Sequence, residues 1–326
     1  MEANRIQWID TYRGLGILLV IFAHLYPNSR IEAHVYSFHM FLFYFLSGYL
    51  FKKSDIKISE YIKKKICGLI IPFLFWDAIS TIIEIILNRN VKASLLRMIT
   101  YNGDLCWNAP IWFLLTTFWV SIIFFVLDRY ILKTSLSTII LMCLSLVISY
   151  FINTNLPLEL DTIALGLFFY VCGVKAKEYN ITDILNKQRL IILPLSLIFS
   201  IILSQVNIRI SVHNSVYGNF PICILSGISG VLLYYFIAQY LQRFKKVIYS
   251  LNFLGKNSMF FMCSQYYVFR SIQIITNYFF DIDLWHFRNT AKALIISFFT
   301  IALLSTIMSI AKKKIPHGFL NIIGVN

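Results

Sequence analysis

Apolar residues fill most of this chain in runs of 17 to 24 residues, and short polar or basic segments separate the runs. An apolar run of this length can cross the ~30 Å hydrocarbon core of a bilayer as a helix. The pattern predicts an all-α integral membrane protein with about ten transmembrane helices. The predicted spans are 12–28, 35–51, 66–88, 109–127, 131–152, 158–176, 190–207, 221–241, 257–280 and 292–311.

Composition supports this class and excludes others. Hydrophobic residues make up 58% of the 326 residues and charged residues 13%, which is far more apolar than a soluble domain. The net charge of +14 does not indicate a nucleic-acid partner, because the Lys and Arg residues fall in the short connections. Since the spans leave room for no further domain, 1–326 is predicted to form one transmembrane domain.

The basic residues also predict the orientation. With ten spans and a cytoplasmic N-terminus, 20 Lys and Arg residues lie on the cytoplasmic side and eight on the outer side. This asymmetry favours both termini in the cytoplasm, the segment 52–65 inside and the segment 89–108 outside. The first apolar run carries Arg13 and His24 and lacks a small-residue cleavage site, so a cleaved signal peptide is not expected.

Asp10, Arg13 and His24 lie in or beside the first span, where ionisable groups are costly and usually functional. Arg13 and His24 are eleven positions apart, so on a helix they are separated by about 16 Å and project from nearly the same side. His39, near the outer end of the second span, is placed to meet His24. The alternative is that Arg13 snorkels to headgroups and His24 lies at an interfacial end.

Other polar residues allow two interpretations each. Asp77 and Glu84 share a helix face, and either line a cavity or form interhelical hydrogen bonds. Trp112 is either a membrane-belt residue or part of a site. Asn257 and Ser258 either cap a helix or offer its N-terminus to a phosphate.

The cysteines and histidines do not predict a metal site. The six cysteines form no C-x-x-C pair, and no Cys/His cluster has ligand spacing. The cysteines are expected to be free and structural.

The sequence RGLGILLVIFAH, from Arg13 to His24, contains an Arg and a His separated by ten residues. With FHMFLFYFLSGYLF, IIPFLFW, PIWFL, FYVCGVK and LGKNS in this order, the chain resembles the integral-membrane acyltransferase family 3, in particular its fucose 4-O-acetylase-like branch. The resemblance implies a multi-pass protein of the bacterial inner (cytoplasmic) membrane. It also implies transfer of an acyl group, usually acetyl, from cytoplasmic acyl-CoA to a sugar hydroxyl of a surface or exported glycan, with acetyl-CoA as a substrate and no permanently bound cofactor.

The resemblance implies that Arg13 and His24 are the paired functional residues, and extends to Asp10 and His39. Gln265 stands where the family commonly has a His. Acyl transfer needs a base, an oxyanion-stabilising group and cations for the CoA phosphates. We expect His24 to be the base, Arg13 with Lys64 and Lys65 to bind CoA, and His39 to orient His24 or donate to the oxyanion.

Substrate contacts are also expected at Trp112, Asn257 and Ser258. Direct transfer and transfer through an acyl-histidine both fit these residues. A flippase or transporter of lipid-linked glycans is the alternative function, although the absence of internal repeats disfavours it. Acyl-CoA, a glycan or lipid-linked sugar and membrane lipid are therefore the expected partners.

Overall fold

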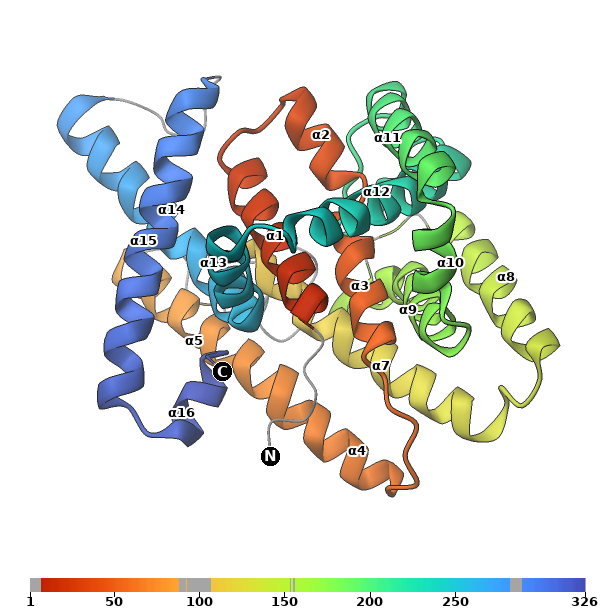
Figure 1. Ribbon diagram of the computed structural model, residues 1–326. Helices are drawn as coiled ribbons and strands as arrows, with labels where there is room; N and C mark the ends of the chain where they lie inside the picture. Colours follow the sequence, from red (N-terminus) through yellow and green to blue (C-terminus); the bar gives the residue numbers. More distant parts are fainter. Residues whose placement is uncertain are drawn as a thin grey trace.

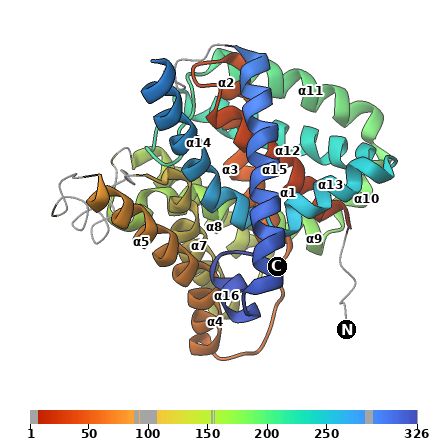
Figure 2. The ribbon, with the colours of Figure 1, turned by 90° about the vertical axis from the view of Figure 1, so that its left-hand side faces the viewer.

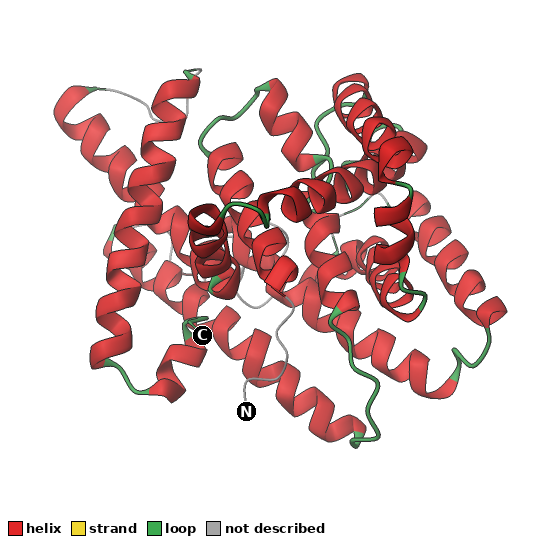
Figure 3. Ribbon diagram, in the orientation of Figure 1, coloured by secondary structure: helices red, strands yellow, loops and turns green. Residues whose placement is uncertain are grey.

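The computed structural model describes residues 7–87, 92, 107–152, 154, 156–281 and 289–325. Throughout these residues the regular structure is helical, and the only pairing of extended backbone is one bridge between Ser211 and Val216 (Figure 3). The all-α class predicted from the sequence is therefore confirmed for the described part of the chain. The predicted outer segment 89–108, Cys106 among it, falls largely outside the described residues.

The described helices follow one another along the chain as Figure 1 shows. The first half contains α1 (Gln7–His24), α2 (Arg30–Tyr36), α3 (His39–Tyr49), α4 (Ile58–Lys65), the π-helix η1 (Ile66–Ile70), α5 (Ile71–Ile86), the 3₁₀ turn η2 (Ala109–Ile111), α7 (Trp112–Tyr130) and α8 (Ser135–Phe151). The second half contains η3 (Pro157–Thr162), α9 (Ile163–Glu178), α10 (Ile181–Lys187), α11 (Arg189–Val206), α12 (Phe220–Leu241), α13 (Lys245–Lys256), α14 (Ser258–Phe280), α15 (Thr290–Lys314) and α16 (His317–Ile322).

Six helical segments in the described part of the chain are long and apolar enough to cross a membrane. They are Ile58–Ile86, Ala109–Tyr130, Pro157–Glu178, Arg189–Val206, Phe220–Leu241 and Thr290–Lys314. The helices α8, α11 and α15 lie at the edges of the molecule and expose many large apolar side chains there (Figures 1 and 2). Such a surface is stable against lipid and not against water, so the protein is a multi-pass membrane protein. The count of ten spans and the orientation remain predictions.

The predicted second span, 35–51, is wrong in its boundaries. Ser29 caps α2, because its hydroxyl accepts a hydrogen bond from the Glu32 N–H, and the helix therefore begins at Arg30. The helix stops at Ser37, whose N–H bonds the preceding turn, and α3 begins anew at His39. The histidine thus occupies the first position of a short helix and not the second turn of a long one.

The third predicted span also begins earlier than expected, because α4, η1 and α5 form one continuous helix from 58 to 86. A proline inside a helix lacks an N–H, and its ring clashes with the carbonyl four residues before it. For Pro72 that carbonyl belongs to Gly68. The helix avoids the clash by widening into the π-helix η1 over Ile66–Ile70. The basic end of α4 thereby continues into the membrane-spanning part.

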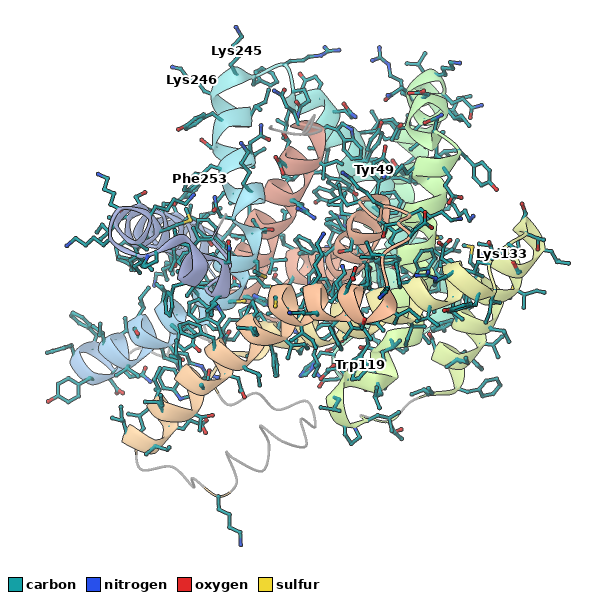
Figure 4. All side chains as sticks on the ribbon, turned by 90° about the horizontal axis from the view of Figure 1, so that it is seen from below. Tyr49, Trp119, Lys133, Lys245, Lys246 and Phe253 are labelled. Atoms are coloured by element: carbon teal, nitrogen blue, oxygen red, sulfur yellow. The ribbon has the colours of Figure 1, made fainter. Side chains whose placement is uncertain are left out.

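Glycines allow α1 and α13 to cross at close range. A Cβ atom built on Gly14 would clash with the backbone of Leu251, and one on Gly255 would clash with the backbone of Asp10. Lys245 and Lys246 project outward at the start of α13, while Phe253 further along faces the other helices (Figure 4). The sequence pattern did not predict this amphipathic helix, because it falls in the connection between the predicted spans 221–241 and 257–280.

A second close crossing joins α3 to α9 in the centre of the fold. A Cβ atom on Gly48 would clash with the backbone of Tyr170, and one on Gly173 with that of Phe45. Beside this crossing, Phe41 and Phe169 stack with their ring centroids 4.3 Å apart. The crossing fixes α3, and with it His39 at the start of that helix.

Different helices form the two ends of the molecule. The C-terminal α16 packs against η1 and the start of α5, at the end of the molecule where α4 lies (Figures 1 and 2). The opposite end carries α2 (Figure 1). α2 packs against both α1 and α11.

Candidate active site

A cavity of about 200 Å³ lies where α1 ends and α3 begins. Its walls come from α1, the α2–α3 junction, η2, the start of α7, the segment 209–214 and α14. Apolar side chains supply much of the wall, and the polar groups are few. The ionisable or aromatic polar residues that line it are His24, Tyr36, His39, Trp112, Arg209, His213 and Tyr266.

His24 is the last residue of α1, so its ring stands at the helix C-terminus. The centroid of the His24 ring lies 5.9 Å from that of Tyr36 and 5.1 Å from that of Tyr266. Gln265 of α14 lies near His24, and neither His24 Nδ1 nor Gln265 Oε1 has a hydrogen-bond partner among the described residues.

His39 enters the same cavity from α3. Its Nδ1 atom lies 2.8 Å from the backbone oxygen of Val35. Because a carbonyl oxygen only accepts hydrogen bonds, Nδ1 carries the proton, and Nε2 of the neutral ring is an acceptor. The expectation that His39 donates to an oxyanion does not fit this neutral form.

Tyr36 lies between the two histidines, with its ring centroid 4.9 Å from that of His39. The Arg209 guanidinium carbon lies 4.2 Å from the Tyr36 ring centroid, and Arg209 Nε donates to Glu32 Oε1 at 2.8 Å. Burial lowers the pKa of Arg209, but Tyr36 and Glu32 outweigh burial and raise this pKa above its ordinary value. Arg209 is therefore a fixed cation at the cavity.

On another wall His213 joins a second buried carboxylate. Its Nδ1 atom lies 3.0 Å from Glu159 Oε1, and its ring stacks on Trp112 at a centroid distance of 5.2 Å. Leu158 and Glu159 both have left-handed backbone angles, with φ of 59° and 58°. Such strain costs about 1–3 kcal/mol per residue and is tolerated where the surrounding structure requires it. Here it turns the Glu159 side chain inward, where it is 2% exposed.

The structure brings together only some of the residues expected to act. His24, His39 and Trp112 line the cavity. Trp112 is 7% exposed and stacked on His213, so it is not a membrane-belt residue. Arg209 and His213 were not expected at the site, since nothing in the sequence distinguishes them from other residues of the connection between the predicted spans 190–207 and 221–241.

The residues expected to bind the donor lie away from this cavity. Arg13 is half-buried on α1, about three helical turns before His24, and Asp10 is buried one turn further back. Lys65 ends α4, with its ammonium 5.4 Å from the centroid of the Tyr61 ring. Asp10 and Arg13 thus lie toward the N-terminal end of α1, whereas the cavity lies at its C-terminal end.

Asn257 and Ser258 lie at the junction of α13 and α14. Asn257 is buried and occupies the N-cap position of α14. Its side chain makes no cap hydrogen bond and instead donates to the Phe253 carbonyl, so the predicted capping role of Asn257 is wrong. Ser258 is the first residue of α14.

Asp77 and Glu84, the acidic pair predicted on one helix face, are both buried on α5. Neither lines the cavity that holds the histidines. Next to Asp77 on the same helix, Ser80 hydrogen-bonds the Tyr267 hydroxyl of α14 at 2.8 Å. The polar face of α5 therefore takes part in packing between α5 and α14.

Comparison with known families decides the class of protein. A family model described as an acyltransferase domain matches residues 6–311. The chain belongs to the acyltransferase-3 family. No curated protein and no solved structure matches the chain of this acyltransferase. The match extends over nearly the whole acyltransferase, from α1 into the last turns of α15, so it includes every element that lines the cavity.

Proposed function

We propose that the protein transfers an acetyl group from cytoplasmic acetyl-CoA to a sugar hydroxyl of a surface or exported glycan, in the bacterial inner membrane. The observation that carries the proposal is the meeting of His24 and His39, from two different helices, in one cavity of a membrane acyltransferase. The proposed topology has ten spans and both termini in the cytoplasm, which places this cavity toward the outer side.

In the proposed reaction His24 is the general base. It takes the proton of the acceptor hydroxyl at the C-terminal end of α1, where its ring lies. His39, whose Nε2 is an acceptor, receives a second hydrogen bond from the sugar and orients it. Gln265 is proposed to hydrogen-bond the His24 ring from the side of α14 when the substrate is bound.

The donor enters from the end of the molecule that carries Arg13. Its phosphates are proposed to bind Arg13, Lys64 and Lys65, because cations and the planar fork of arginine suit phosphate oxygens. The nucleotide portion of CoA is proposed to contact Asp10 and the N-terminus of α14 at Asn257 and Ser258. Trp112 contributes an aromatic wall at the acceptor end.

The test combines cells and purified protein. We expect mass spectrometry of surface glycans to find acetyl esters that disappear when the gene is deleted. Purified protein in nanodiscs should release CoA from acetyl-CoA in the presence of a methyl glycoside chosen from a panel. Movement of a lipid-linked glycan without CoA release would instead support a flippase.

Two histidine variants make this test specific. His24→Gln should lower turnover by about 10²-fold to 10⁴-fold, because an amide cannot take up the proton. His34→Gln is the matched control, since His34 hydrogen-bonds Ser204 and Tyr234 and does not line the cavity. Normal glycan acetylation in His24→Gln, at normal expression, would contradict the assignment of the base.

A further inference from the structure

Acyl transfer places negative charge on the carbonyl oxygen, and the two histidines do not supply a donor for it. His24 is the proposed base, and the neutral His39 ring already donates its proton to Val35. Tyr36 and Tyr266 also line the cavity, but a neutral hydroxyl forms a hydrogen bond about half as strong as a charged donor does. A charged donor at this position would contribute most to catalysis.

Arg209 is the only permanently charged cation among the described residues that line the cavity. Glu32 accepts the hydrogen bond from Nε, and an arginine has four further N–H groups on its two terminal nitrogens. Glu32 is 2% exposed and does not line the cavity. The ion pair is therefore a dipole with its positive end at the cavity and its negative end behind it.

Two residues of α2, Glu32 and Tyr36, hold the Arg209 guanidinium rigidly. Glu32 is held at the start of α2, where its N–H bonds Ser29 and its Oε2 accepts the Asn28 N–H. Tyr36 follows four residues later, so both side chains lie on one face of the helix. One binds the guanidinium edge and the other covers its face. A donor held in this way needs no reorganisation during the reaction.

We propose that Arg209 is a further catalytic residue, whose guanidinium binds the acyl carbonyl oxygen and stabilises the oxyanion. This assignment rests on the proposed function. As the acceptor oxygen bonds to the carbonyl carbon, its proton passes to His24 and the carbonyl π electrons move to the oxygen beside Arg209. When the C=O bond re-forms, the C–S bond breaks, and the CoA thiolate leaves and takes the proton from His24.

The test uses the full-length protein in nanodiscs, with acetyl-CoA and the methyl glycoside that the wild-type protein acetylates fastest. Arg209→Gln should lower kcat by about 10²-fold to 10³-fold and leave both KM values nearly unchanged. Arg209→Ala should regain part of its turnover when guanidinium chloride is added, and not with sodium chloride at equal ionic strength. Arg30→Gln is the matched control, because Arg30 is exposed at the start of α2, the helix that carries Glu32 and Tyr36, and does not line the cavity.

Unchanged kcat in Arg209→Gln, a loss confined to the acceptor KM, or an Arg209→Ala variant that guanidinium does not rescue would each overturn the assignment. If Arg209→Gln fails to fold, Glu32→Ala decides. This variant keeps the arginine but removes the acceptor that orients it, and a kcat equal to that of the wild type would refute the proposal. If the wild-type protein acetylates no glycoside, the proposed function itself fails, whereas an active wild type with an active Arg209→Gln sinks only the role of Arg209.

Discussion

The close crossing of α3 and α9 predicts that alanine is destabilising at Gly173, and Gly68, which lies outside the crossing, supplies the control. In Gly173→Ala the new Cβ atom would clash with the Phe45 carbonyl and lie 2.7 Å from the backbone nitrogen of Tyr49, whereas ordinary contacts begin at 3.4 Å. The helices must therefore separate by at least about 0.7 Å, and a gap of roughly this size forfeits a quarter to a half of each dispersion contact.

The free-energy cost follows from two opposing effects. Overpacking of this kind costs about 1–3 kcal/mol, and the obstacle here is backbone, which cannot rotate away. Alanine favours the helix over glycine by about 0.5–1 kcal/mol. The net destabilisation of Gly173→Ala should be about 1–2 kcal/mol. We expect the melting temperature in detergent, followed by tryptophan fluorescence, to fall by about 2–5 °C.

Gly68→Ala provides the control. No atom lies within 4 Å of the Cβ position at Gly68, so only the gain in helix propensity remains, and the melting temperature should stay the same or rise slightly. Since His39 begins α3, Gly173→Ala should also lower turnover of the folded protein. A Gly173→Ala protein that melts at or above the wild-type temperature would refute the close crossing.

Three further predictions concern the donor end, the orientation and the ring of the base. Arg13→Lys should keep partial activity with a raised KM for acetyl-CoA in a donor titration, and a lower kcat at unchanged KM would place Arg13 in the chemical step. In a cysteine-free background, Lys57→Cys should resist an impermeant maleimide in intact cells while Ile208→Cys, at a 58% exposed position, reacts; labelling of Lys57→Cys would reverse the orientation. Gln265→Leu should lower kcat by about tenfold, through loss of the hydrogen bond that Gln265 is proposed to form with His24, and an unchanged kcat would show that Gln265 does not orient the ring.

Sequence periodicity predicted the helical class well, because each apolar run must satisfy its backbone inside lipid. It misplaced the second span because the apolar residues continue from 35 to 51, although the Ser29 and Glu32 signal for a separate helix start is present in the sequence. The amphipathic helix α13 was missed because it is too short to cross a membrane, and its packing on α1 depends on Gly14 and Gly255.

The candidate site was predictable in part. His24 was found because an ionisable group in an apolar run is conspicuous, and His39 because it lies close to His24 along the chain. Arg209 was counted only as a charge of the outer side. Its partner Glu32 is 177 residues away, and no local pattern records a contact of that range. Folding alone brings the two together.

The length of α3 limits how far each substrate has to travel. The helix has 11 residues, which span about 16 Å, roughly half of a ~30 Å hydrocarbon core. His39 lies at one end of it, and the exposed segment with Lys52 and Lys53 follows the other end. In the proposed reaction the acetyl group, carried by CoA, therefore crosses only about half the thickness of the membrane before it is transferred to the sugar. The sugar meets it in a recess on the far side, so neither substrate has to cross the whole bilayer.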